Sequence, residues 1–407
     1  MTDFPSFEPT RSMVLARLLS GAKLDVLQLV DMTGLSQSTV FRSVEELLRV
    51  PSLLERTLAR QVGRGRPTTK IAFNRRYALV IGVVLGSRTT RMVLADALGT
   101  TVAQVRVPTP QNASAVEIAD WLVHEATSLC ERSGGGAALG AVGIGLPGAV
   151  TLDKDRVVGS RNLPQITGAD FIERVRAQLH VPVAFENDSH LALLGELSYG
   201  RVAKSGATVL VTMSTGISAA VAVDGEILVG KDGSLGEFGR LSLPGSQLRI
   251  RDLLSGAGLA ALARASGIPV DSSKELAPIS DQYPELMRQI DQTLEHLLGI
   301  IALAYEPHTV MLTGGFSEIF HTDRLREIAS KVAAVSLVEC RVDRADLGDD
   351  SALLGTIALA SLTLYAKFGV DKGQLGSLPQ ASDVPRQLSA VPIVTMDERD
   401  VATETSR

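Results

Sequence analysis

The fold is decided by the stretch Val80-Ile81-Gly82-Val83-Val84-Leu85-Gly86-Ser87-Arg88-Thr89-Thr90-Arg91-Met92-Val93-Leu94-Ala95-Asp96. Its first part is apolar and β-branched, a break follows at Gly86-Ser87, and alternating apolar residues then resume. This pattern predicts two strands joined by a tight turn, a buried β-hairpin. Such a turn at the start of an α/β domain can hold a phosphate with its backbone N–H groups, but the chemistry also needs a carboxylate for Mg²⁺. The sequence has no carboxylate between residues 80 and 90.

Length and composition indicate a protein of two or three domains with a sizeable core. The chain has 407 residues, of which 45% are hydrophobic, but no run of 18 apolar residues that would predict a membrane span. The first residues lack the basic region and apolar core of a signal peptide. Cys130 and Cys340 are isolated and offer no disulfide framework. We therefore expect a cytoplasmic protein.

Charge divides the chain unevenly. Residues 1–76 carry 12 Lys/Arg and 7 Asp/Glu, a balance of +5, whereas the remainder carries 28 and 38, a balance of −10. An acidic surface repels nucleic acid, so any contact with DNA should come from the first 76 residues.

Those first 76 residues predict three helices. Residues 1–9 are expected to form a loose arm, and helical spacing of apolar residues then runs from Thr10 to Gly21 and over about 24–32. Gly34 is a turn residue, and Ser36 is the expected N-cap of a third helix over residues 37–48. A helix, a glycine turn and a helix that begins with Gln-Ser-Thr are typical of a helix-turn-helix DNA reader.

The start of the third helix and the following basic segment supply the candidate DNA contacts. Small hydroxyls and an amide can meet phosphates and base edges, and an arginine between glycines can enter a narrow minor groove. A three-helix protein-interaction module is the alternative, because spacing alone does not distinguish the two. The candidate DNA-binding residues are Ser36, Gln37, Ser38, Thr39, Arg42, Arg64 and Arg66.

From Tyr77 onward, strands alternate with helices, which indicates an α/β architecture. The last predicted helix spans about residues 351–368. The end of the chain is rich in Ser, Pro, Asp and Thr, so residues 371–407 are expected to form a flexible tail.

Between Tyr77 and about Phe368 the chain resembles the ROK family (repressors, open reading frames and sugar kinases). The resemblance implies the two-lobed actin/hexokinase-like (ribonuclease H-like) α/β fold. Together with residues 1–76, it is similar to the repressor branch, in which an α+β winged helix-turn-helix precedes a sugar-binding body. The matching pieces follow one another in family order: the first hairpin, Gly143-Ile144-Gly145-Leu146-Pro147-Gly148, Glu186-Asn187-Asp188, Ser214-Thr215-Gly216-Ile217, Gly233-Ser234-Leu235-Gly236-Glu237-Phe238-Gly239 and Leu312-Thr313-Gly314-Gly315.

The departures from the family pattern predict that the chain is not an enzyme. Family kinases begin with Asp-x-Gly-Gly-Thr, whereas this chain has Val84, Ser87 and Arg88 at the carboxylate, second glycine and threonine. The second phosphate loop is also altered, with Ser218-Ala219-Ala220 in place of glycines. A valine cannot hold Mg²⁺, so we expect no catalytic residue.

The resemblance also includes a zinc site that this chain lacks. Family members carry a histidine and a run of cysteines, but residues 240–251 here contain neither. Zinc needs three or four such ligands, so we expect no metal and no cofactor. Packing of Leu248, Ile250 and Leu253 is expected to replace the metal.

The resemblance implies that a sugar site remains. Carboxylates and amides suit a polyol and can bind it without catalysis. Alternatively, Asn187 and Asp188 merely cap the helix that starts near Ser189. Arg240 replaces the family histidine and would reshape the pocket, favour an acidic or phosphorylated ligand, or fill the pocket. The candidate ligand-binding residues are Asn162, Asn187, Asp188, Glu237 and Arg240.

The sequence thus predicts a DNA-binding transcriptional regulator, a repressor of carbohydrate-related genes without kinase activity. Its expected domains are residues 1–76 (winged helix-turn-helix with basic linker), 77–185 with 349–370 (first lobe), 186–348 (second lobe) and 371–407 (tail). The expected partners are double-stranded operator DNA, a sugar or sugar derivative between the lobes, and further copies of the chain in a homodimer or homotetramer. The alternatives are an active sugar kinase with a DNA-binding arm and a DNA-binding dimer that needs no ligand.

Overall fold

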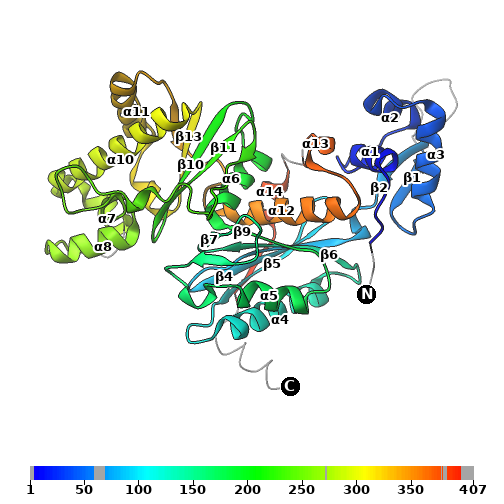
Figure 1. Ribbon diagram of the computed structural model, residues 1–407, viewed down its shortest axis with the longest axis horizontal. Helices are drawn as coiled ribbons and strands as arrows, with labels where there is room; N and C mark the ends of the chain where they lie inside the picture. The colour runs from blue at the N-terminus through cyan, green and yellow to red at the C-terminus, as the bar shows by residue number, and fades with distance from the viewer. Residues whose placement is uncertain (1–3, 59–68, 271–272, 377, 379–382, 396–407) are drawn as a thin grey trace. The chain divides into compact units, whose positions relative to one another are not determined.

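The computed structural model describes residues 4–58, 69–270, 273–376, 378 and 383–395. The chain divides into two compact units, Met1–Glu186 with Leu353–Arg407, and Asn187–Ala352 (Figure 1). No helix among the described residues is long and apolar enough to cross a membrane.

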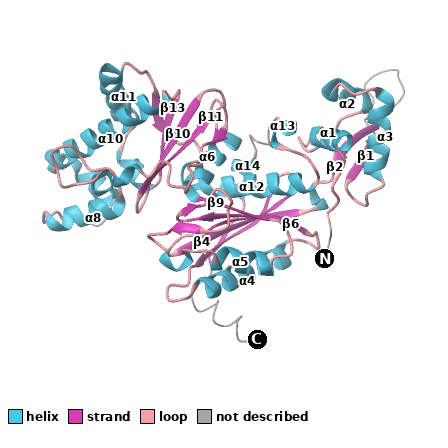
Figure 2. Cartoon of the chain, in the orientation of Figure 1, coloured by secondary structure: helices cyan, strands magenta, loops and turns pink. Residues whose placement is uncertain are grey.

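The first unit begins with three helices and a two-stranded sheet. The helices are α1 (Pro9–Leu18), α2 (Val26–Thr33) and α3 (Gln37–Leu48). Strands β1 (Leu54–Leu58) and β2 (Thr69–Phe73) pair antiparallel. Apolar side chains from all three helices are buried in this N-terminal module, as the helical spacing predicted. Figure 2 colours the helices and strands of the described residues by type.

The N-terminal arm is anchored, in contrast to the expected loose arm. Phe4 is buried, and the N–H of Phe7 donates to the carbonyl of Phe368 at 3.1 Å. The Phe368 ring is surrounded by four others, with centroids 6.0–6.4 Å from its own: Phe4, Phe7, Phe73 and Tyr77. The Tyr77 ring also lies 5.7 Å from that of Phe4 and 6.1 Å from that of Phe73. Such tilted and edge-on ring pairs add to the energy of burial. The arm is fixed because its aromatic residues find partners from the far end of the chain.

The predicted hairpin is confirmed. It consists of β3 (Leu79–Val84) and β4 (Thr89–Asp96), paired antiparallel. Among the described residues it forms the middle of a six-stranded sheet of order β15-β5-β4-β3-β6-β9. The other strands are β5 (Thr101–Pro108), β6 (Leu139–Leu146), β9 (Val183–Asn187) and β15 (Ile393–Thr395).

Helices cover both faces of this sheet (Figure 1). Side chains of Leu79, Ile81 and Val83 share a core with α4 (Ala115–Ser133) and α5 (Asp170–Gln178). The opposite face carries α12 (Ser351–Lys367). A Cβ added to Gly143 would lie 2.6 Å from the carbonyl oxygen of Thr356. The backbone of α12 can therefore approach the sheet this closely only because residue 143 is a glycine without a side chain.

The described part of residues 371–407 differs from the expected flexible tail, whereas residues 377, 379–382 and 396–407 lie outside the described residues. Residues 371–376 contain α13 (Lys372–Leu375), and α14 (Val384–Ala390) is followed by β15. Strand β15 pairs parallel with β5, and Val384 and Leu388 are buried. The amide of Gln104 on β5 donates to the carbonyl of Leu388 at 3.1 Å. Polar composition predicted disorder, but two buried aliphatic residues and an unpaired sheet edge hold this segment.

The second unit contains a five-stranded sheet of order β12-β11-β10-β13-β14 within the described residues. Its strands are β10 (Ala207–Met213), β11 (Ile217–Val223), β12 (Glu226–Ile227), β13 (Thr309–Thr313) and β14 (Arg341–Arg344).

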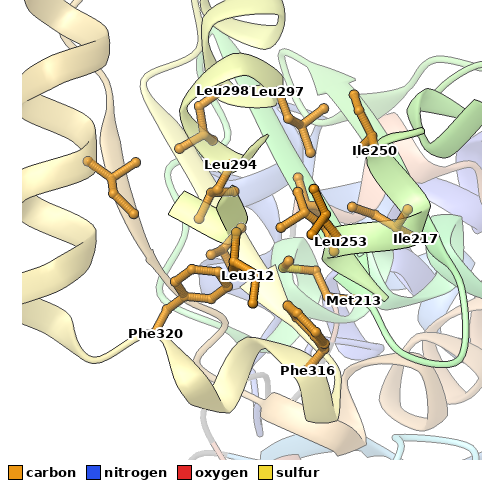
Figure 3. Close-up of a cluster of buried hydrophobic side chains, with 14 of the residues drawn as sticks. Met213, Ile217, Ile250, Leu253, Leu294, Leu297, Leu298, Leu312, Phe316 and Phe320 are labelled. Atoms are coloured by element: carbon orange, nitrogen blue, oxygen red, sulfur yellow. The ribbon is translucent and has the colours of Figure 1, made fainter. Parts of the chain in front are cut away.

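Helices pack on both faces of the second sheet as well. Helix α6 (Asp188–Tyr199) packs through Leu193 and Leu197 on one face. The larger core on the other face, shown in Figure 3, joins Met213 and Leu312 to the surrounding helices. Those helices are α7 (Ile250–Leu254), α8 (Gly256–Ala265), α9 (Ser273–Leu276), α10 (Pro284–Tyr305) and α11 (Thr322–Ser336).

Candidate functional site

The start of α3 has the predicted capping geometry. The Ser36 hydroxyl accepts a hydrogen bond from the N–H of Thr39 at 3.2 Å, which confirms Ser36 as the N-cap. The same hydroxyl lies 3.0 Å from that of Ser38 and 2.8 Å from that of Thr39. The three hydroxyls therefore bond to one another and stiffen the first turn of the helix.

Polar side chains at the start of α3 face solvent. Gln37, Ser38 and Arg42 are exposed, whereas Val40, Val44 and Leu47 are buried. A hollow of about 540 Å³ adjoins this surface, lined by Glu8, Thr10, Arg11, Thr39, Arg42, Ser43, Glu46 and Arg49. Arg49 follows Arg42 by seven residues, so helical spacing could have found it. Arg11 reaches the hollow only because α1 packs on α3.

Several arginines and lysines that follow α3, between residues 56 and 76, form ion pairs with carboxylates. Lys70 forms an ion pair with Asp25 at 2.7 Å, and Arg75 with Asp96 at 2.9 Å. Arg56 pairs with Glu45 on α3. Half-buried Asp25 has a pKa below its usual value because the hydrogen bonds from Lys70 and from the backbone outweigh its desolvation. Arg56 and Lys70 therefore support the module itself, and Arg75 ties it to β4 of the first unit. The predicted contacts Arg64 and Arg66 lie outside the described residues.

The turn of the β3–β4 hairpin is bonded to the loop after β5. The Thr109 hydroxyl donates to the carbonyl of Gly86 at 2.8 Å, and the Gln111 amide donates to that of Ser87 at 2.7 Å. The N–H of Thr109 donates to the carbonyl of Arg88 at 2.9 Å. Protein groups therefore hold the turn, and an aliphatic side chain stands at Val84.

The second candidate surface begins at the N-terminus of α6. The Asn187 side-chain oxygen accepts hydrogen bonds from the N–H groups of Ser189 at 2.9 Å and His190 at 3.3 Å. The capping role that the sequence left open is thus confirmed for this oxygen. Asp188 occupies the first helical position. The Ser189 hydroxyl lies 2.6 Å from that of Ser218 on β11, one of the residues that replace the family glycines.

The carboxyl group of Asp188 has an unusual pKa. Burial raises its pKa from 3.8 to about 6, and the negative charge of nearby Glu237 acts in the same direction. The Glu237 carboxylate is therefore near enough to Asp188 to disfavour the charged form of that side chain. Perturbed carboxyl groups of this kind gather at binding and catalytic sites.

Two glycines place Glu237 against β11. Gly236 has a φ of +87°, which a glycine adopts easily because it has no side chain. Its carbonyl accepts a hydrogen bond from the N–H of Ala219 at 2.9 Å. A Cβ on Gly239 would lie 2.6 Å from the Ile217 side chain. The Arg240 guanidinium lies 3.5 Å from the Glu237 carboxylate and has 67% of its side chain exposed. Arg240 therefore extends from the loop into solvent beside Glu237.

The loop after Arg240 is a short hairpin. Ser242 pairs with Arg249, and the N–H of Leu243 donates to the carbonyl of Leu248 at 2.8 Å. Ile250 and Leu253 are buried in the core of the second unit, and Leu248 packs against it. These contacts are those that the sequence predicted in place of the family's metal ligands.

The structure thus brings together four of the five predicted ligand-binding residues: Asn187, Asp188, Glu237 and Arg240 all lie in the second unit near the start of α6 and β11. Asn162 is exposed and belongs to the first unit. Sequence reasoning missed Ser189 and Ser218, whose contact depends on the packing of α6 against β11.

Comparison with known sequences gives a consistent family. The family model described as "ROK family" matches residues 80–362. The chain is 25% identical over 236 residues to the xylose repressor of Bacillus subtilis, an alignment that covers 57% of this chain and 60% of that protein. The chain thus spans about 60% of the length of that relative. It is also 25% identical to the N-acetyl-D-glucosamine kinase of Pectobacterium atrosepticum, covering 68% of this chain and 97% of the kinase.

Comparison with solved structures extends the likeness beyond the matched family region. A ROK family transcriptional regulator described as a homolog of the E. coli MLC protein superposes with a TM-score of 0.72 at 15% identity. The superposition covers 88% of this chain and 98% of the regulator. The predicted two-lobed α/β fold class is thereby confirmed.

Proposed function

This chain belongs to the ROK family, and we propose that it acts within that family as a DNA-binding transcriptional repressor, not as a sugar kinase. The observation that carries this proposal is the exposed polar face of α3, capped by Ser36, in a helical module that precedes the family body. In this proposal the module is a winged helix-turn-helix, and β1 and β2 form the strands of the wing. The xylose repressor relative and the charge balance of +5 over residues 1–76 support it.

In the proposed complex, α3 enters the major groove of an operator. Gln37 can pair with adenine through its amide, and Arg42 with guanine or a phosphate. Arg49 lines the same hollow as Arg42 and suits the phosphate backbone, whereas Arg11 pairs with Glu8 at 3.3 Å and Glu46 at 3.5 Å. Arg64 and Arg66 remain proposed contacts on sequence grounds alone.

Selection from a random DNA library with the full chain tests this proposal. We expect one enriched, palindromic site, and Arg42→Ala should weaken binding to it and reduce the slope of log Kd against log salt by about 1. Arg174→Ala is the matched control, because Arg174 is a partly exposed arginine of the first unit that pairs with Asp120 outside the module. A library without enrichment, or an Arg42→Ala variant with the control's affinity and slope, would count against the proposal.

We further propose that the effector is a sugar derivative with a negative charge. Asp188 and Glu237 can accept hydrogen bonds from hydroxyl groups. Within the described part of the chain, the Arg240 guanidinium has one ion pair, to Glu237 at 3.5 Å, and 67% of the side chain is exposed, so it can pair bidentately with a phosphate or carboxylate of the ligand. The effector would act by binding one arrangement of a homodimer or homotetramer more tightly than another.

Thermal unfolding with sugars and their phosphates tests the charge of the effector. At 100 times Kd, a ligand that binds only the folded state adds about 2.7 kcal/mol to the free energy of unfolding. We expect a sugar phosphate to raise the melting temperature more than its parent sugar, and Arg240→Ala to remove the difference. Arg326→Ala is the control, because Arg326 is 73% exposed in the same unit and also pairs three residues away, with Asp323. A difference that survives in Arg240→Ala would disprove this role.

Sugar kinase activity is the competing function, favoured by the N-acetyl-D-glucosamine kinase relative and by the carboxyl group of Asp188. A coupled ADP-release assay with a sugar panel distinguishes the two. Turnover that disappears in Asp188→Asn would establish the kinase. A melting temperature that no sugar or sugar phosphate raises would instead favour a ligand-independent DNA-binding dimer.

A further inference from the structure

The exposed face of α3 carries an aromatic residue that the polar candidates do not explain. The chain has ten phenylalanines, all within the described residues, and nine of them are at least partly buried. Phe41 is the exception, with 56% of its surface exposed. Singly exposed apolar residues are common, so exposure alone means little. The position of Phe41 on α3, however, indicates a function for the exposed ring.

Phe41 lies one helical turn after Gln37 and next to Arg42. Residues four apart on a helix share a face, so Phe41 stands on the surface that is proposed to enter the major groove. The buried residues Val40, Val44 and Leu47 form a stripe about a quarter turn away from Phe41. More than half of the Phe41 surface therefore stays outside the core of the module, where a partner can contact it.

The chemistry of the major groove offers one apolar feature to such a ring. Each T·A pair presents the C5-methyl group of thymine, and side chains such as phenylalanine contact it. One turn of α3 rises 5.4 Å, which spans one to two base-pair steps of about 3.4 Å. Gln37 and Phe41 can therefore address neighbouring base pairs at the same time.

We propose that Phe41 is a specificity-determining residue that recognises the methyl group of thymine in the operator. This inference rests on the proposed DNA-binding function. Because the hydroxyls of Ser36, Ser38 and Thr39 bond to one another, Gln37, Phe41 and Arg42 are the side chains of this turn left to read bases. The site read by α3 should contain a thymine beside the base that Gln37 contacts.

Deoxyuridine substitution tests the proposal, because uracil pairs as thymine does but lacks the methyl group. Each thymine of the selected operator is replaced in turn, and binding of the full chain is measured by fluorescence anisotropy. We expect one or two positions at which wild-type affinity falls about fourfold, the effect of one buried methyl group. In Phe41→Ala the same substitutions should leave affinity unchanged.

Two further variants make the result specific. Leu27→Ala removes another exposed apolar side chain of the module, 62% exposed on α2, and should keep the fourfold uracil effect. Phe41→Leu is used if Phe41→Ala binds DNA too weakly to measure. It keeps an apolar side chain and should retain part of the uracil effect. A uracil effect that is equal in Phe41→Ala and wild type, or absent from wild type, overturns the inference while the proposed DNA binding stands. A wild-type chain that selects no site overturns both.

A protein contact is the remaining outcome. If Phe41→Ala changes the oligomeric state in light scattering and leaves the uracil effect intact, the ring belongs to an interface between proteins and the thymine contact is wrong.

Discussion

Asp188→Asn is expected to stabilise the protein at pH 7.5 and to have little effect on its stability at pH 4. The pKa of Asp188 is raised in the folded state from 3.8 to about 6 because burial disfavours the charged form. Well below pH 3.8 the carboxyl group is protonated in both folded and unfolded chains, so folding gains or loses nothing from it. As pH rises from about 4 to 6, the unfolded chain gives up this proton more readily than the folded chain, and the resulting loss of stability builds up to about 3 kcal/mol above pH 6.

Asparagine removes that cost. The pKa of about 6 already includes the favourable helix N-terminus, and Asp188 is only partly buried, so solvent screening should reduce the gain at pH 7.5 to about 2 kcal/mol. Urea unfolding between pH 4 and 8 measures it. Asp170→Asn is the control, because Asp170 also begins a helix, α5, but is exposed. An effect of Asp188→Asn that is equal at pH 4 and pH 7.5 would contradict the role of burial.

The destabilising charge of the Asp188 carboxylate suggests a function for this side chain. Proteins retain such groups where function requires them. An effector whose hydroxyl donates to the Asp188 carboxylate should therefore bind more tightly above pH 6 than below it, and Asp188→Asn should abolish that dependence.

Gly143→Ala is expected to destabilise the first unit by about 3 kcal/mol. The added methyl group would lie 2.6 Å from the carbonyl oxygen of Thr356 and 3.0 Å from the nitrogen of Ala360, both in the backbone of α12. A backbone atom inside a helix cannot turn away as a side chain can, so α12 and β6 must separate. Urea unfolding followed by circular dichroism measures the loss.

Gly159→Ala supplies the matched comparison. Gly159 ends the short strand β8 (Val157–Gly159), and a Cβ there meets nothing within 4 Å. We expect its free energy of unfolding to stay within about 0.5 kcal/mol of wild type. Two variants with equal stability would show that α12 does not need the close approach at Gly143.

Local features of the fold could be predicted from the sequence. The hairpin followed from the apolar runs on either side of Gly86-Ser87, and the start of α3 followed from Ser36, because a capping hydroxyl acts within three residues. The order of the family motifs extended this local reading to the whole body.

Features that depend on distant partners could not be predicted. Phe368 fixes the N-terminal arm, and the edge of β5 orders β15, although nearly 300 residues separate those strands. The basic segment gave no sign that Lys70 would meet Asp25. At the candidate ligand site, the residue types predicted binding, but the raised pKa of Asp188 arises from burial that only the assembled unit provides.

The order of the chain also bears on how the protein forms during synthesis. The second unit is one continuous segment, residues 187–352, whereas the first unit needs α12 and β15 from the end of the chain to complete its sheet and its aromatic cluster. Domains form as their residues leave the ribosome, from the N-terminus onward. Here the second unit can finish folding while the sheet that precedes it still lacks a helix and an edge strand. The N-terminal module therefore becomes anchored only after Phe368 has been made.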